Sequence, residues 1–144
     1  MIQTDTIELL KECNAGIKMG VSSIDEILDK VSDEDFKKIL TDNKEEHQRL
    51  GSETRKLLNE YNETGKEPAA LAKGMSWIKT NIMTSVNDSD NTIADLITDG
   101  CNMGVKSLNR YLNKYAAADE VSKDITKKLI NLEQQLAMDT RAYL

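Results

Sequence analysis

The chain has 144 residues and a formal net charge of −6, with 31% charged and 39% hydrophobic residues. This length predicts a single domain over residues 1–144, and the composition supplies enough apolar side chains for a buried core. The negative charge argues against nucleic acid or an anionic membrane as the main partner, because both require a concentrated basic surface. Aromatic residues at 4% and a single proline argue against an all-β or loop-rich chain.

The sequence carries no sign of export or of membrane insertion. Residues 1–6 lack the basic start and the apolar core of a signal peptide. The weakly charged stretch 74–86 contains Lys79 and is too short and polar to span a bilayer. Cys13 and Cys101 do not form a C-x-x-C pattern. We therefore expect a cytoplasmic protein with two reduced thiols and no membrane partner.

The first half of the chain predicts a helical hairpin over 4–62. Apolar or inward-facing residues recur at spacings of three and four, which is typical of one helix face. The first stripe comprises Ile7, Leu10, Asn14, Ile17, Val21, Ile24 and Leu28, and the second Phe36, Leu40, Asn43, His47, Leu50, Thr54, Leu57 and Tyr61. Between them, Ser32 reads as an N-cap with Asp35 three residues later, and Gly65 suits the left-handed end of the second helix.

The second half predicts a connecting helix and a second hairpin. Pro68 opens a helix over 68–86, which includes Trp77. A hairpin over 92–144 follows, in which Thr92 and Asp95 are spaced as a capping box. Its two core stripes comprise Ile97, Cys101, Gly104, Leu108, Leu112 and Tyr115, then Val121, Ile125, Leu129, Leu132, Leu136 and Tyr143.

Two segment pairs indicate an internal repeat. Residues 12–18 match 100–106 at four of seven positions, with an offset of 88. Residues 47–58 match 133–144 at five of twelve, with an offset of 86. Two matches in the same order at nearly one offset indicate two related hairpins. A long helix spans roughly 40 Å at about 1.5 Å per residue, and the connecting segment can climb that length. We therefore predict an all-α, up-down-down-up four-helix bundle with an extra helix in its long crossover.

This architecture resembles the ferritin-like superfamily, over nearly the whole chain. The segments 12–18 and 99–104 are also similar to those of small bacterial proteins of unknown function grouped with that fold. The resemblance implies the bundle and a metal site inside it. Di-iron members place one Glu on each of two helices and Glu-x-x-His on each of the other two. Here Lys44 stands three residues before His47, the sole histidine, and Ile130 stands before Glu133, so the motif is not intact.

Two interpretations of the bundle interior stay open. In the first, His47, Glu133, Asn14 and Asn102 form a buried polar layer whose members satisfy one another and fix helix register. In the second, His47 and Glu133 are the protein ligands of a single iron, zinc or manganese ion. A carboxylate beside His47 would also raise the pKa of the imidazole. Glu12, on the far side of its helix from the core stripe, is expected to face solvent.

The two cysteines occupy equivalent places in the repeat. Gly16 and Gly104 follow them by three residues, which predicts a narrow seam where helices approach closely, with Cys13 and Cys101 as buried small hydrophobes. No Ser or Cys is assigned beside the histidine, and no glycine-rich phosphate loop is present. We therefore expect a non-catalytic protein without a required cofactor that acts through surface interaction or self-association, with a homodimer or a protein partner. The alternative is a metal-binding or redox-related protein.

Overall fold

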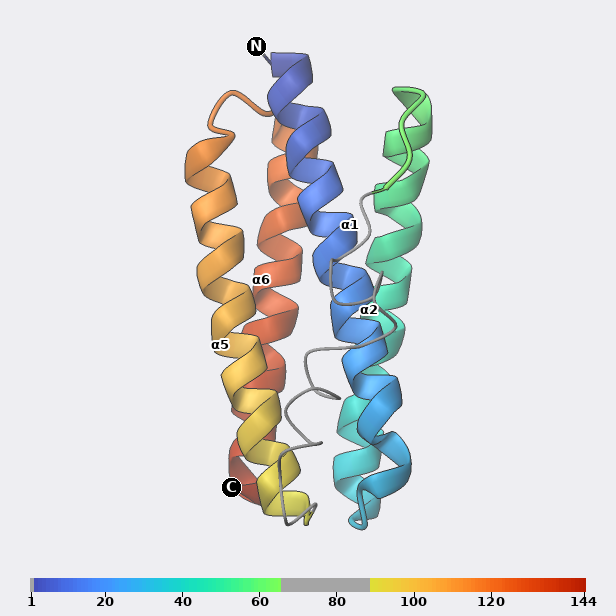
Figure 1. The fold of residues 1–144 in the computed structure, drawn as a ribbon, viewed down its shortest axis with the longest axis vertical. Coiled ribbons are helices and arrows are strands. Elements are labelled where there is room, and N and C mark those ends of the chain that lie inside the picture. Colours follow the sequence, from blue (N-terminus) through green and yellow to red (C-terminus); the bar gives the residue numbers. More distant parts are fainter. Residues whose placement is uncertain (1, 66–88) are drawn as a thin grey trace.

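Four long helices follow from the four apolar stripes. The computed structural model describes residues 2–65 and 89–144, and within these ranges it is helical without strands (Figure 1). The prediction of an all-α four-helix bundle is confirmed. The helices are α1 (Ile2–Ile27), α2 (Glu34–Glu60), α5 (Asp90–Lys114) and α6 (Glu120–Thr140), with short 3₁₀ turns η1 (Leu28–Lys30) and η2 (Arg141–Tyr143). The helix predicted over 68–86 lies outside the described residues.

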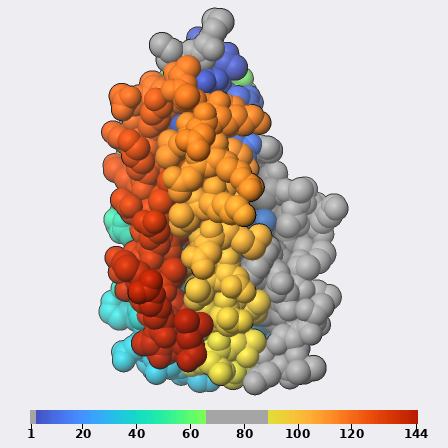
Figure 2. Space-filling model, turned by 90° about the vertical axis from the view of Figure 1, so that its left-hand side faces the viewer, coloured from blue at the N-terminus to red at the C-terminus, as the bar shows by residue number. Residues whose placement is uncertain are grey.

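Hydrogen bonds at the two ends of the bundle define how the helices are directed. At one end, the amide of Ala117 in the α5–α6 loop donates to Asp5 in the first turn of α1 over 3.0 Å. At the other end, the amide of Ser32 in the α1–α2 loop donates to Asp90, the first residue of α5, over 2.8 Å. The helices thus run up, down, down and up in chain order (Figure 1). Helix α1 contacts the other three, and Figure 2 shows α5 and α6 packed along their length.

Three helix boundaries differ from those expected. Asp33, rather than Ser32, caps α2 and accepts a hydrogen bond from the amide of Phe36 over 2.9 Å. Helix α2 ends at Glu60, and the left-handed residue after it is Asn62, with φ of 57°, rather than Gly65. Asparagine tolerates this left-handed conformation, and the amides of Asn62 and Glu63 close the helix end on carbonyls of its last turn. Helix α5 begins after Ser89, so Thr92 lies within it and is not its cap.

The core lies along the bundle axis in two clusters. One cluster contains Phe36, whose ring stacks on Tyr143 of η2 at 4.4 Å between centroids. The other surrounds Leu10 and Leu58. Thr54 is fully buried, as its stripe predicted, and so is Thr140; each hydroxyl donates to a carbonyl one turn earlier. One core assignment was wrong, since Val121 is 54% exposed. Leu57 is partly buried against the second cluster, and its neighbour Leu58 is the fully buried residue.

Candidate functional site

The structure brings His47 of α2 and Glu133 of α6 into direct contact. Nε2 of His47 lies 2.9 Å from Oε1 of Glu133, and Nδ1 lies 3.0 Å from the carbonyl oxygen of Asn43. The imidazole is 1% exposed, whereas the Glu133 side chain is 13% exposed. His47 belongs to the apolar stripe of α2 and Glu133 borders that of α6, so helix geometry directs both side chains inward. The contact between them agrees with either interpretation of the site.

The environment of His47 favours the charged imidazolium. Burial on its own would lower the pKa of His47, but the hydrogen bond and charge of Glu133, together with the Asn43 carbonyl, outweigh it and raise the pKa. In the imidazolium both ring nitrogens carry hydrogen, so each donates to one of these acceptors. The two residues therefore form a buried ion pair in which both N–H groups of His47 have an acceptor.

This ion pair belongs to one polar level that interrupts the core. The level contains His47 of α2, Glu133 of α6, Gly20 of α1 and Gly104 of α5. On each helix, a residue of one core cluster precedes this level and a residue of the other cluster follows it. The pairs are Ile17 and Ile24 on α1, Leu40 and Leu50 on α2, Cys101 and Leu108 on α5, and Leu129 and Leu136 on α6. A layer built from an ion pair and two glycines thus separates two apolar clusters.

The two glycines at this level leave the ion pair without side-chain cover from α1 and α5. A Cβ on Gly20 would lie 3.0 Å from Cδ2 and Nε2 of His47. A Cβ on Gly104 would lie 3.4 Å from Oε2 of Glu133. The seam of small residues was expected to let the helices approach closely. Instead, the four glycines of α1 and α5 line a cavity, and at this level no side chain of these two helices covers the ion pair.

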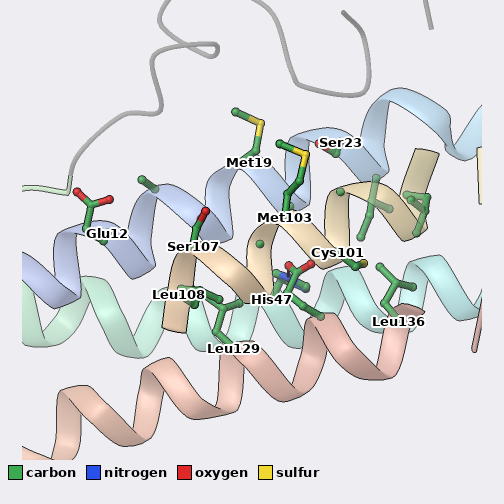
Figure 3. A pocket seen from close by; sticks show the side chains of 18 of the residues that line it. Glu12, Met19, Ser23, His47, Cys101, Met103, Ser107, Leu108, Leu129 and Leu136 are labelled. Atoms are coloured by element: carbon green, nitrogen blue, oxygen red, sulfur yellow. Dashed lines mark hydrogen bonds and ion pairs between the residues drawn. The ribbon is translucent and has the colours of Figure 1, made fainter. Parts of the chain in front are cut away.

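The cavity has a volume of about 490 Å³ and reaches the ion pair at its floor (Figure 3). Helix α1 lines it from Glu12 to Ile24 and α5 lines it from Leu96 to Tyr111. Leu129 and Leu136 of α6 lie on one side of the cavity, and Met19 and Met103 lie on the opposite side (Figure 3). The expectation that Glu12 faces solvent was wrong, since it is half-buried at one end of this cavity. The volume is within the range of small-molecule sites.

Both thiols are buried and unpaired with each other, as expected for reduced cysteines, but their surroundings differ. Cys101 lines the cavity, where burial and the nearby Glu133 carboxylate raise the pKa of its thiol. Cys13 lies in the core, 3.1 Å from the Thr126 hydroxyl, and burial raises its pKa to about 11. Both sulfurs are therefore held as protonated thiols, which are weak nucleophiles and weak metal ligands.

The prediction of a four-residue polar layer was wrong for Asn14 and Asn102, neither of which joins His47 and Glu133. Asn102 is exposed, because α5 is covered on fewer sides than α1 at this point. Asn14 is fully buried, but it lies six residues, or about 9 Å along α1, from the level of Gly20 and His47. Neither amide atom of Asn14 has a hydrogen-bond partner among the described residues. The structure therefore retains only His47 and Glu133 from the predicted layer.

The residues at the polar level do not fit a carboxylate-bridged di-iron centre. Such a centre needs carboxylates on all four helices, and here α1 and α5 offer glycine. Across residues 2–65 and 89–144, no three His, Cys, Asp or Glu side chains are grouped so as to hold a metal ion. Lys44, which replaces the motif glutamate, forms an ion pair with Asp25 of α1. A metal at this level would have His47 and Glu133 as its protein ligands and would need solvent to complete its shell.

Sequence reasoning identified the ion pair but missed the cavity. The available signal was the recurrence of glycine at four-residue spacing, at Gly16 and Gly20 and again at Gly100 and Gly104. All four glycines line the cavity. Glycine on an inner helix face is compatible with close packing or with a void, so the pattern alone leaves both open.

Comparison of the chain with protein-family models, curated proteins and solved structures finds no match. None of the described helices combines the length and apolarity that crossing a bilayer requires. The functional assignment therefore depends on the site itself.

Proposed function

We propose that the protein is a non-catalytic, ferritin-like four-helix bundle, built from two related hairpins, that binds a small molecule between α1 and α5. The observation that carries this proposal is the 490 Å³ cavity with the His47–Glu133 pair at its floor. Small-molecule sites are concave and mostly apolar with a few placed polar groups, and the described lining of this cavity has that character.

The lining fits a ligand that is apolar along most of its length and polar at one point. Aliphatic side chains and methionines form the walls, and the described polar groups are few. Small-molecule sites typically combine apolar walls with a small number of placed polar groups that orient the ligand. Both ring nitrogens of His47 are already engaged, so the imidazole is not a free base for proton transfer. This arrangement supports binding rather than catalysis.

The test is binding of the neutral fluorophore N-phenyl-1-naphthylamine, whose emission rises in apolar surroundings. We expect saturable binding at one site per chain. Gly104→Leu places a side chain in the cavity and should abolish binding. Asn102→Leu adds the same side chain two residues away on the exposed face of α5 and should leave binding unchanged. Thermal unfolding of both variants verifies that they fold. Equal binding by a folded Gly104→Leu variant would refute the assignment of the cavity as the site.

A second candidate function is binding of a single iron, zinc or manganese ion by His47 and Glu133. It is favoured by the contact between Nδ1 of His47 and the Asn43 carbonyl, because metal-binding histidines commonly donate their other ring N–H to such an acceptor. Metal analysis of untagged protein distinguishes the two candidates. Stoichiometric metal that is lost in His47→Ala would support the metal site. Protein without stoichiometric metal that still binds the fluorophore would support the ligand cavity.

Surface interaction and self-association are the remaining ways for a non-catalytic bundle to act. The large hydrophobic side chains that the described residues expose are dispersed, on α5 at Met103, on α6 at Val121 and Met138, and at Leu144. Dispersed residues of this kind are normal for a soluble surface and do not form the contiguous patch of an interface. Sedimentation equilibrium tests this point, and we expect a monomer.

A further inference from the structure

We infer that the cavity between α1 and α5 is specific for an apolar amine, whose ammonium group is bound by the Glu133 carboxylate. This inference rests on the proposed ligand-binding function and adds the chemical class of the ligand. It follows from which charged groups reach the cavity, which hydrogen bonds they already make, and the shape of the walls.

The charged side chains of the described lining favour a cation. They are Glu12, His47 and Glu133, and no lysine or arginine is among the described lining residues. His47 directs both ring nitrogens at protein acceptors, so it has no N–H left for an anionic ligand. A carboxylate or phosphate group beside Glu133 would face that carboxylate, and the described lining offers it hydroxyl groups, as at Ser23 and Ser107, but no lysine or arginine. Like charges in such a partly desolvated site repel each other strongly.

Glu133 retains capacity to accept hydrogen bonds from a ligand. A carboxylate has about four lone-pair sites. The described residues supply two donors, which are Nε2 of His47 and the thiol of Cys101. The remaining acceptor sites border the cavity, where Gly104 leaves Oε2 uncovered by a side chain. An ammonium group offers three donors and a full positive charge, and hydrogen bonds between ions are about twice as strong as neutral ones.

The walls suit an extended aliphatic body. The lined stretch of α1, from Glu12 to Ile24, extends about 18 Å at about 1.5 Å per residue. The polar level crosses the middle of this stretch at Gly20, with apolar residues of the two core clusters on both sides. A linear chain with its amine at Glu133 would contact one apolar half of the cavity along its length (Figure 3).

The experiment compares octylamine, octanol and octanoate, which share one aliphatic chain and differ in the head group. Each is titrated calorimetrically into wild-type protein at neutral pH, below the concentration at which it forms micelles. We expect octylamine to bind about tenfold more tightly than octanol, and octanoate to bind more weakly than octanol. Equal affinities, or tighter binding of octanoate, would overturn the inference while leaving the ligand-binding function intact. Binding of none of the three would overturn both.

Two variants separate recognition by Glu133 from attraction of a cation to the acidic surface. Glu133→Gln should lower octylamine affinity to that of octanol and leave octanol binding unchanged. Gly104→Leu should abolish binding of both. Octylamine binding that survives in a folded Gly104→Leu variant would assign it to the surface and overturn the inference. If Glu133→Gln does not fold, the wild-type series and Gly104→Leu still decide the outcome.

Discussion

Gly20 and the ring of His47 are in contact so close that a Cβ at position 20 would lie 3.0 Å from both Cδ2 and Nε2. The ring cannot yield without disturbing its hydrogen bonds to Glu133 and to the Asn43 carbonyl. The equivalent approach at Gly104 is looser, since its Cβ would lie 3.4 Å from a carboxylate oxygen that borders open space. Substitution by alanine should therefore change the free energy of unfolding in opposite directions at the two glycines.

Gly104→Ala should raise the free energy of unfolding by about 0.5–1 kcal/mol, because alanine favours the helix over glycine. Gly20→Ala should lower it by about 1–2 kcal/mol, because the cost of overpacking exceeds that gain. Urea denaturation of both variants and of the wild type measures the difference. Stabilisation of similar size at both positions would show that the His47 ring moves freely, contrary to the fixed geometry described above.

The ion pair predicts a dependence of stability on pH. The pKa of His47 is raised in the folded protein above its ordinary value of 6.5. Its contribution to stability is therefore fully present below pH 6.5 and is lost as the pH rises through the folded value. The free energy of unfolding should therefore fall as the pH rises from 6.5 through the raised pKa of His47. His47→Gln, which does not titrate, should flatten this slope, and a slope that persists in His47→Gln would assign it to another group.

Asn14 predicts a stabilising substitution at a buried polar residue. Its amide is fully buried beside Gly65 and has no hydrogen-bond partner among the described residues. Asn14→Leu, which has a similar shape, should raise the free energy of unfolding by about 1–2 kcal/mol. Asn43→Leu is the matched control, because Nδ2 of Asn43 donates to the Leu132 carbonyl over 3.1 Å. It should lower stability by about 1 kcal/mol. Destabilisation by Asn14→Leu would indicate a partner for this amide.

The two thiols predict a labelling pattern that reports on the cavity. Cys101 lines the cavity, whereas Cys13 lies in the core against Thr126. Methyl methanethiosulfonate should modify Cys101 slowly, since its raised pKa keeps the thiol protonated, and should leave Cys13 unmodified until the protein unfolds. Saturating octylamine should protect Cys101. Peptide mass spectrometry gives the extent at each cysteine, and faster modification of Cys13 would contradict the assigned positions.

The periodic stripes predicted the helices and the inward direction of His47 and Glu133 because helix periodicity alone determines which side chains share a face. Asn14 and Asn102 show that periodicity does not predict burial at the border of a helix face. Each follows a buried cysteine by one residue, yet Asn14 is buried and Asn102 is exposed. A position at the border of a helix face is buried only if a neighbouring element covers it, and this depends on tertiary contacts. The cavity was not predictable for the same reason, because it results from how far apart α1 and α5 are held.

Hydrogen bonds fasten the ends of that cavity and so determine how a ligand would enter and leave. Asp5 and Thr6 of α1 hold the α5–α6 loop at one end, and Asp90 of α5 holds the α1–α2 loop at the other. The described contacts thus hold α1 and α5 at both ends of the bundle, and between these ends the two helices can separate by bowing outward. Exchange is then gated by this bowing, so the observed association rate should level off at high ligand concentration. Asp90→Ala releases one end, and both association and dissociation should become faster.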